Sequence, residues 1–391
     1  MHVRYVFMTF PAPSEAFACE EVRALRQVGI EVSVACMRAQ PRFARALLSE
    51  RKLTDLSITH ANIFSVVYGL CAVVRRPALS YRVLASVLSL TWKKPRDLLV
   101  SLALIPRAFI IAEGSRIEGV DVVHLFWGHY PALVGLVIRE MRLSVRLTLS
   151  LGAYDLERAY PLAKVVAQSG IVITHAQANR RKVSQLCGVT SESVHVIYRG
   201  VAIPPNADLV TRPKTVVIAE RLISPKRTID SLMVFAKASY EHPDLRLDVL
   251  GDGPERDNLK LWAQHLGVDA QVRFWGHLPH HEALSYIEKA GLLISMSQSA
   301  GERLPNVVKE AMARNSVCIV TRTPGIEELV VPGHTGYVVE PGDIEGAAVL
   351  LKKLIADSDT RLCVARNAQQ HVEQQFDLDK TTKQRIDIWA R

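Results

Sequence analysis

Residues 292–320, LLISMSQSAGERLPNVVKEAMARNSVCIV, decide the fold of this chain. An apolar run at Leu292–Ser295 is followed by a polar loop, and Pro305 then suits the first turn of a helix. A second apolar run, rich in Val and Ile, ends the stretch at Val317–Val320. Strands that alternate with helices pair in parallel, so the stretch predicts one repeat unit of a parallel sheet.

The same alternation continues in both directions from this stretch. Further strands are predicted at Val3–Met8, Glu31–Cys36, Asp121–Leu125, Val145–Leu149, Ile171–Thr174, His195–Ile197, Thr215–Ala219, Leu245–Leu250, Gln271–Phe274 and Tyr337–Val339. Helices are predicted at Glu15–Val28, Pro131–Met141, Thr228–Tyr240, Arg256–Leu266, His280–Ala290, Pro305–Ala313, Ile326–Val330 and Ile344–Ala356. Because parallel sheets are covered by helices on both faces, the pattern predicts an α/β protein with two Rossmann-like domains facing each other across a cleft.

The length of 391 residues is enough for two or three domains. The two blocks of strands meet at residues 201–213, a polar stretch with prolines that is predicted to be a linker. We therefore place an N-terminal domain at residues 1–205 and a C-terminal domain at residues 206–375. A last helix at residues 376–391 is then free to pack back on the first domain.

The composition excludes several classes of protein. With 49% hydrophobic and 22% charged residues, the chain is neither disordered nor collagen-like. Its six cysteines are far apart and none forms a C-x-x-C pair, which argues against a zinc ribbon and a disulfide scaffold and fits a reducing compartment. The first residues lack the pattern of a signal peptide, so we expect a cytoplasmic protein.

The net charge of +9 is concentrated in residues 38–107, where twelve Lys or Arg face three acidic residues. Apolar stretches separate the basic residues, and residues 56–74 carry no charge. Three interpretations are open: a membrane span, core helices with solvated basic edges, and a basic amphipathic surface on an anionic membrane, which we favour. Nucleic acid is not expected as a partner, because aromatic residues are few and no binding motif is present.

Two loops that follow predicted strands carry candidate binding residues, since ligands of such sheets bind at the carboxyl ends of the strands. Arg221 and Lys226 follow the strand at 215–219 and precede a helix, an arrangement suited to a diphosphate. Glu302 and Glu310 flank the start of the helix after the strand at 292–295, and carboxylates are good acceptors for the paired hydroxyls of a sugar or a ribose. Solvated basic residues and a chance pair of glutamates are the alternatives.

Taken in order, the loops resemble a known family. The stretches ERLISPKR, LRLDVLGDGPERDNL, VRFWGHLPHHE and PGIEELVVPGHTGYVVEPGD, with the Glu-x7-Glu element, are similar to the donor-binding half of glycosyltransferase family 4. These are retaining enzymes with the two-domain GT-B fold. In the first half, FPAPSEAFACEEVRAL, HLFWGHYPAL and LGAYDLERAY resemble a subgroup that builds colanic-acid-type exopolysaccharides.

The resemblance implies a role for each matching residue. Arg221 and Lys226 would hold the diphosphate of the donor, Glu302 the hydroxyls of the donor sugar, and Glu310 the ribose. The other donor-side positions are Phe274, Trp275, Arg303, Leu304, Pro305 and Asn306. His129 is expected at the reaction centre, and the acceptor-side positions are Pro11, Ser14, His124, Tyr154 and Asp155.

The implied activity is transfer of a sugar, with retained configuration, from a nucleoside-diphosphate sugar to a glycan or lipid-linked oligosaccharide in bacterial surface polysaccharide synthesis. No metal and no cofactor besides the donor substrate are implied. The expected location is the inner face of the membrane, with residues 38–107 in contact with anionic lipid. An epimerase and a nicotinamide oxidoreductase are less well supported, the latter because no G-x-G-x-x-G follows a strand.

The chain departs from the family pattern at several positions. Glu220 and Arg303 stand where the family usually has glycine. Phe126 and Gly152 stand where the subgroup has histidines, for which a nearby histidine could substitute. These departures keep open the alternative of a catalytically silent protein that binds nucleotide sugars or acts as a scaffold.

Overall fold

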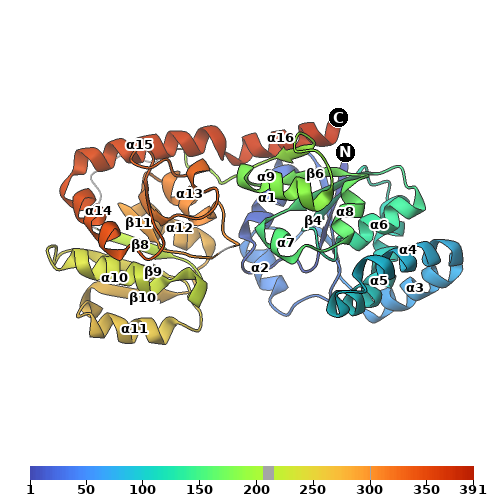
Figure 1. Ribbon diagram of the computed structural model, residues 1–391, viewed down its shortest axis with the longest axis horizontal. Helices are drawn as coiled ribbons and strands as arrows, with labels where there is room; N and C mark the ends of the chain where they lie inside the picture. Colours follow the sequence, from blue (N-terminus) through green and yellow to red (C-terminus); the bar gives the residue numbers. More distant parts are fainter. Residues whose placement is uncertain (206–214, 300) are drawn as a thin grey trace. The chain divides into compact units, whose positions relative to one another are not determined.

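The computed structural model describes residues 1–205, 215–299 and 301–391. These residues form two compact units, one made of Met1–Tyr198 with Thr382–Arg391 and the other of Arg199–Thr381. The predicted domain start at residue 206 and most of the predicted linker lie outside the described residues. Each unit contains one parallel sheet with helices on both faces (Figure 1). The predicted α/β fold with two parallel-sheet domains is confirmed.

The sheet of the first unit has the order β3-β2-β1-β4-β5-β6-β7, with every neighbouring pair parallel. Its strands are β1 (His2–Phe7), β2 (Glu31–Cys36), β3 (Ser57–Thr59), β4 (Val122–Phe126), β5 (Arg146–Leu151), β6 (Ile171–Thr174) and β7 (Val194–Val196). The edge strand β3 was not predicted, because it is short and lacks an apolar run. The other strands begin and end close to their predicted bounds.

The helices of the first unit are α1 (Ala16–Gln27), α2 (Ala44–Glu50), α3 (Ile63–Arg75), α4 (Pro77–Thr91), α5 (Pro95–Ile117), α6 (Ala132–Met141), α7 (Ala153–Arg158), α8 (Leu162–Ala167) and α9 (Gln177–Cys187). α1 buries Ala18, Val22 and Leu25, which recur at helical spacing and face the core. The basic segment at residues 38–107 consists mainly of helices α2 to α5.

Among the described residues, one helix, α5, is long and apolar enough to cross a membrane, and half of its apolar window is buried inside the first unit. α3 and α4 pass the same test only as a pair, but they are bent by 106° where they meet. α3 has 13 residues, whereas a span needs about 20. The uncharged run at 56–74 therefore does not form a straight spanning helix.

The C-terminal helix packs into the core of the first unit. Helix α16 (Leu378–Ala390) places Trp389, which is fully buried, against the rings of Tyr5 and His124. Arg385 Nη2 donates to Glu21 Oε2 at 2.8 Å, and both side chains are buried. The last residues are thus part of the first unit's packing.

The sheet of the second unit has the order β10-β9-β8-β11-β12-β13, again all parallel. Its strands are β8 (Thr215–Ala219), β9 (Arg246–Leu250), β10 (Val272–Gly276), β11 (Leu292–Ser295), β12 (Val317–Thr321) and β13 (Tyr337–Val339). Its helices are α10 (Thr228–Ser239), α11 (Arg256–His265), α12 (His280–Lys289), α13 (Asn306–Met312), α14 (Ile344–Ala356) and α15 (Ser358–Gln375), with 3-10 turns η1 (Ser224–Lys226), η2 (Asp269–Gln271) and η3 (Ile326–Glu328). The segment predicted as a helix at 326–330 is the single turn η3, and α15 was not predicted.

Both sheets have a point where the order of the strands reverses. In the first unit this point lies between β1 and β4, and in the second between β8 and β11. Loops that leave the carboxyl ends of two such strands run to opposite faces of the sheet, which opens a crevice for ligands. These two places carry the candidate site residues.

Candidate active site

The loops after β8 and β11 are held together at the reversal point of the second sheet. The backbone N–H of Gln298 donates to the carbonyl of Pro225 at 3.0 Å. Lys226 Nζ lies 2.5 Å from Glu302 Oε1, and Ser297 Oγ donates to Glu302 Oε2 at 2.5 Å. The side chains of Lys226 and Glu302 are only 14% and 15% exposed, so their charges interact with little screening by water. The structure therefore brings together two of the residues predicted to hold the donor.

The loop after β9 supports the loop after β8 through its backbone. Leu222 N donates to Asp252 O at 3.0 Å, and Glu255 N donates to Leu222 O at 3.1 Å. Gly251 has a φ of +134°, and a Cβ there would overlap the carbonyl oxygen of Glu220. Only glycine combines that conformation with so close an approach. The position of the loop that carries Arg221 and Lys226 thus depends on this glycine.

Glu220 interacts electrostatically with both members of the ion pair. Thr228 Oγ1 donates to Glu220 Oε1 at 2.9 Å, and Ser295 Oγ lies 3.5 Å from Glu220 Oε2. Burial raises the pKa of Glu220 from its ordinary 4.5 to about 7, with the charge of Lys226 acting in the opposite direction and that of Glu302 adding to the increase. The residue that replaces the family's glycine is therefore a titratable group coupled to the candidate site.

Glu310 lies on α13 and is bound by a histidine of the preceding helix. His280 Nε2 lies 2.9 Å from Glu310 Oε1, and the Glu310 side chain is 17% exposed. The next residue back, Lys309, is buried, and its Nζ donates to Arg199 O and Asn306 Oδ1 at 3.0 Å each. Burial lowers the pKa of Lys309 to about 7, and the charge of Arg199 lowers it further while that of Glu310 raises it.

The remaining donor-side residues around Glu302 occupy different environments. Arg221 is exposed, and no ion pair joins it to another described residue. Arg303 and Leu304 are buried, so the Leu304 side chain belongs to the protein interior. Pro305 has no N–H, and so the amide donors expected here reduce to those of Leu304 and Asn306.

Phe274 and Trp275 lie on β10, the edge strand of the second sheet. The register of the β9–β10 pairing shifts between Phe274 and Gly276. Trp275 Nε1 donates to Asp248 Oδ1 at 2.8 Å, and its ring packs on Tyr286 with the centroids 4.6 Å apart. Two strands separate this pair from the loop of β11, so the structure places it at the far side of the candidate crevice rather than beside Glu302.

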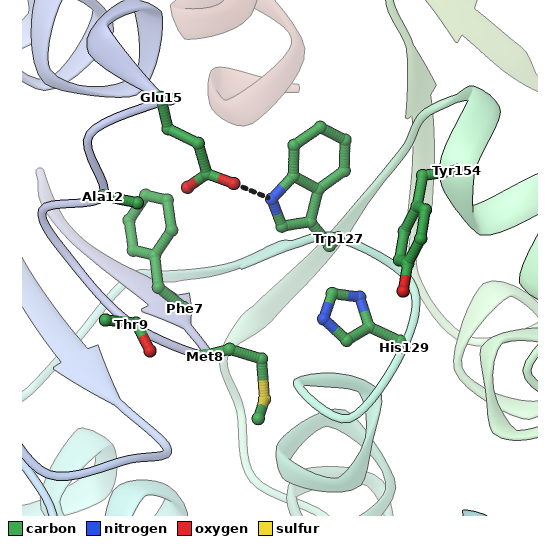
Figure 2. Close-up of a pocket in the computed structure, with 8 residues that line it drawn as sticks. All are labelled: Phe7, Met8, Thr9, Ala12, Glu15, Trp127, His129 and Tyr154. Atoms are coloured by element: carbon green, nitrogen blue, oxygen red, sulfur yellow. Dashed lines mark hydrogen bonds between the residues drawn. The ribbon is translucent and has the colours of Figure 1, made fainter. Parts of the chain in front are cut away.

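A pocket of about 350 Å³ opens at the reversal point of the first sheet (Figure 2). It is lined by Phe7, Met8, Thr9, Ala12, Glu15, Trp127, His129 and Tyr154. Trp127 Nε1 donates to Glu15 Oε1 at 3.1 Å, which joins the loop after β4 to the start of α1. The walls are thus mostly aromatic or apolar, with a carboxylate and an imidazole as the polar groups.

Asp155 fixes the loops that carry the pocket histidine. Its Oδ1 accepts from Gly128 N and its Oδ2 from Gly152 N, both at 2.8 Å. His129 Nδ1 lies 3.4 Å from the same Oδ1, so the carboxylate is positioned to orient the imidazole. Among the described residues nothing hydrogen-bonds His129 Nε2, and the ring lines the pocket. Asp155 is buried and therefore positions other groups rather than contacting a ligand.

Three predicted acceptor-side residues do not line this pocket. His124 is fully buried in β4, where its Nδ1 lies 2.6 Å from Thr148 Oγ1, and burial lowers the pKa of its imidazole well below 6.5. Its prediction on the acceptor side is wrong, because the strand turns its side chain into the core. Pro11 is buried and Ser14 is exposed outside the pocket, while their neighbours Ala12 and Glu15 line it.

The two positions where the subgroup has histidine are filled differently here. Phe126 is buried among the aromatic rings of Phe7 and Phe17. A Cβ at Gly152 would lie 2.6 Å from the Trp127 ring and 2.9 Å from His175 Cε1. The indole of Trp127 therefore takes the space that a side chain at position 152 would need.

Comparison with known proteins identifies the family. Residues 202–371, which include every loop of the candidate donor site, match the family described as glycosyl transferases group 1. The chain also aligns with 75% of N-acetyl-alpha-D-glucosaminyl L-malate synthase of Bacillus anthracis, with 25% identity over 293 residues that make up 70% of this chain. The chain is a glycosyltransferase family 4-like protein with the GT-B fold.

Solved structures show the same fold for this family 4-like protein. Anabaena HepE, crystallised in complex with UDP, has a TM-score of 0.73 and 18% identity over the full length of both chains. A further relative, an exopolysaccharide phosphotransferase of Streptomyces coelicolor, is 33% identical over 145 residues, which are 37% of this chain and 15% of that protein. The evidence that the chain is a transferase thus comes mainly from its C-terminal half.

The sequence did not indicate several residues that the structure adds to the site. Ser297 and His280 bind the two glutamates, and Glu15 and Trp127 line the pocket of the first unit. Glu15 and Trp127 stand inside the motifs that resemble the exopolysaccharide subgroup, which was the available signal. Among the described residues, no group of three or more His, Cys, Asp or Glu side chains is arranged to hold a metal.

Proposed function

We propose that this family 4-like protein transfers a sugar, with retention of anomeric configuration, from a nucleoside-diphosphate sugar to a glycan or a lipid-linked oligosaccharide. The observation that carries the proposal is the Lys226–Glu302 pair at the strand reversal of the second sheet. It places a cation and a carboxylate, both largely buried, at the position where such folds bind ligands.

The diphosphate of the donor is assigned to Lys226 and Arg221. The Lys226 ammonium has three N–H donors, so it can keep its bond to Glu302 while it binds a phosphate oxygen. Arg221 is exposed and free to bind two oxygens through its planar guanidinium. Both cations stabilise the negative charge that grows on the diphosphate as it leaves, which lowers the barrier to transfer.

The two glutamates are assigned to the two sugars of the donor. Glu302 accepts from hydroxyls of the transferred sugar, and Lys226 and Ser297 hold its carboxylate in place. Glu310 accepts from the ribose hydroxyls, while His280 keeps its side chain oriented. A carboxylate has acceptor positions for several donors, so neither role requires these protein contacts to break.

The acceptor is assigned to the pocket of the first unit. In a retaining transfer the acceptor oxygen attacks from the face that the diphosphate leaves, its bond to the anomeric carbon forms as the bond to phosphate breaks, and its proton passes to the departing phosphate. His129, oriented by Asp155, is assigned to hydrogen-bond the reacting groups through Nε2. The aromatic walls formed by Phe7, Trp127 and Tyr154 suit the apolar faces of sugar rings.

The setting that we propose is synthesis of bacterial surface or exopolysaccharide at the inner face of the membrane. Support comes from the exopolysaccharide role in the name of the Streptomyces relative and from the resemblance of the N-terminal motifs to the colanic-acid subgroup. UDP is the nucleotide to test first, because structures of the similar HepE contain UDP and UDP-glucose. The basic segment at 38–107 would hold the protein near a lipid-linked acceptor.

Calorimetry with UDP, GDP and ADP, followed by a transfer assay with the sugar of the nucleotide that binds, tests this function. Lys226→Gln is expected to lower nucleotide affinity by roughly tenfold to a hundredfold, the usual value of one hydrogen bond to a charged group. Lys260→Gln, on the exposed face of α11, is the matched control. Nuclear magnetic resonance of the product gives the anomeric configuration. Nucleotide binding without any turnover of donor, or an inverted product, would contradict the proposal.

A further inference from the structure

Helix α3 exposes an apolar stripe on the surface of the first unit. Ile63, Val67, Leu70 and Val74 recur at helical spacing and point outward, and Phe64 and Tyr68 lie beside them. Ile63, Phe64 and Val74 are 74%, 71% and 76% exposed. A stripe of this size on a soluble surface indicates an interaction site.

Helix α4 continues this apolar surface. Its outward positions Tyr81, Leu84 and Leu88 also recur at helical spacing, and Trp92 directly follows the helix. Tyr81 and Trp92 are 73% and 63% exposed. Helices α3, α4 and α5 pack against one another in the first unit (Figure 1). We call the outward faces of α3 and α4, residues 63–92, the apolar ledge.

The orientation of the apolar ledge is fixed by packing on its inner side. Gly69 and Ala72 are buried, and a Cβ at Gly69 would overlap the backbone of Pro106 in α5. On α4, Val83 and Val87 are fully buried in the core. Since the inner face of each helix is already occupied, the ledge cannot turn inward to bury its own side chains.

The unpaired charge at the ledge is positive. Two of its arginines are neutralised by acidic residues of other helices, Arg76 by Glu113 at 2.7 Å and Arg82 by Glu140 at 3.0 Å. Asp97 is the only acidic residue from 56 to 112, and it is buried and paired with Arg158 at 2.8 Å. Arg75, Lys93 and Arg96 are exposed, and no ion pair joins any of them to another described residue. An apolar face bordered by unpaired cations matches a surface that offers hydrocarbon together with negative charge.

We propose that the apolar ledge docks on an anionic lipid bilayer, with α3 and α4 lying in the headgroup region and their apolar side chains inserted. The helices lie on the membrane rather than span it, because they have 13 and 15 residues and meet at a bend of 106°. A second copy of the chain is less suited to cover the ledge, since two faces of the same charge repel each other. The inference narrows the membrane contact of the proposed function to one surface and does not depend on the transfer reaction.

Cosedimentation of the full chain with vesicles tests the docking. Vesicles of phosphatidylcholine with 30% phosphatidylglycerol are expected to bind the protein at least about tenfold more tightly than pure phosphatidylcholine vesicles, because each nearby Lys or Arg contributes about 1 kcal/mol. Raising the salt concentration weakens that preference. Equal binding to both kinds of vesicle, or none to the anionic ones at low salt, would overturn the proposal.

Paired variants separate the ledge from the rest of the surface. The double variant Phe64→Ser, Val67→Ser is expected to lower vesicle binding at least about fivefold, as loss of the buried apolar area requires. Its control is Tyr240→Ser, Leu261→Ser, which changes side chains that are 92% and 65% exposed in the second unit. Lys93→Gln with Arg96→Gln, against Arg181→Gln with Lys182→Gln on α9, tests the charge in the same way.

Two further measurements make each outcome decisive. Lipid brominated on its acyl chains should quench tryptophan fluorescence, and Trp92→Phe should remove most of the quenching. Sedimentation velocity tests whether a second copy of the chain covers the ledge instead. A dimer of the unsubstituted protein that is lost in the double variant Phe64→Ser, Val67→Ser would overturn the proposal. UDP affinity is measured in parallel. A ledge variant that loses vesicle binding and keeps its UDP affinity supports the docking. If the unsubstituted protein binds UDP but not anionic vesicles, the docking alone is refuted, and if it binds the vesicles but not UDP, the proposed donor site alone is refuted.

Discussion

Lys226 has a carboxylate on each side of it, and this arrangement sets the electrostatics of the candidate donor site. Glu302 forms the direct ion pair, and Glu220 interacts with the charges of both residues. If both glutamates were ionised, they would cancel the charges of Lys226 and Arg221 and leave no net positive charge for a diphosphate. With Glu220 protonated, Lys226 and Glu302 neutralise each other, and the exposed Arg221 supplies the charge for the phosphate.

The two glutamates of the second unit are expected to respond differently to removal. Glu310→Ala should weaken UDP binding by roughly tenfold to a hundredfold, since a carboxylate that binds ribose contributes about 1.5 to 3 kcal/mol. Glu302→Ala should lower kcat and leave UDP affinity nearly unchanged, because UDP lacks the transferred sugar. Calorimetry with UDP and steady-state kinetics measure the two effects. Negligible effects of both substitutions would refute the assigned roles.

Glu220 should make the second unit lose stability as the pH rises. Its carboxyl binds a proton more tightly in the folded protein, with a pKa of about 7, than in the unfolded chain, with a pKa near 4.5. The folded state therefore becomes less stable between about pH 4.5 and pH 7. Glu220→Gln removes the free energy needed to ionise the buried carboxyl, so it should stabilise the unit by on the order of 2 to 3 kcal/mol at pH 8. The difference in stability between the variant and the original protein should shrink towards pH 4.5.

Thermal melts of the two proteins across that pH range provide the measurement. The variant should melt roughly 5 °C above the original protein at pH 8. Glu373→Gln, an exposed position on α15, controls for the loss of a surface charge. A constant difference at every pH would show that Glu220 is not titrating in the folded protein.

At the scale of elements, the loop after β9 determines where the loop after β8 lies. Gly251→Ala should displace the Glu220 backbone and lower both the melting temperature of the second unit and its UDP affinity. Gly267→Ala is the matched control, because Gly267 also has a positive φ but has no atom within 4 Å of a new Cβ. The control should cost only about 1 kcal/mol of backbone strain and leave UDP affinity unchanged. Similar losses of UDP affinity in both variants would contradict the supporting role of Gly251.

The strands were predictable where their residues are buried on both faces of a parallel sheet. β2, β6, β8 and β11 have the bounds that their Val and Ile runs indicate. β3 was missed because it is an edge strand with polar ends, and η3 because one turn and a short helix share the same apolar spacing. Local sequence specifies such elements only when burial imposes a period.

The sites were predictable in part, for a related reason. Residues in the loops of the second unit match a dense set of motifs, which pointed to Lys226 and Glu302 before the structure placed them in contact. In the first unit the motifs indicated His129 and Tyr154, which line the pocket, but also Pro11, Ser14 and His124, which do not. Whether His124 or His129 faces the pocket depends on strand alternation and on the turn after β4, which a motif does not specify.

At the scale of the whole molecule, the C-terminal residues complete the core of the N-terminal unit. Trp389→Ala is expected to lower the stability of the first unit by about 3 to 5 kcal/mol, the usual effect of removing a fully buried indole. UDP affinity should be unchanged, because the candidate donor residues all belong to the second unit. Trp92→Ala, at an exposed position of the same unit, is the control. Calorimetric melts measured with and without UDP report the two units separately.

The indole of Trp127 restricts which residues position 152 can hold. A relative that carries histidine at position 152 cannot also carry tryptophan at 127 in this rotamer, because the two side chains would overlap. The substitution Gly152→His alone therefore creates a steric clash. Replacing Trp127 by a smaller residue first avoids the clash but removes the hydrogen bond to Glu15. The residues at positions 127 and 152 are therefore coupled, because any side chain at 152 requires a smaller residue or another rotamer at 127.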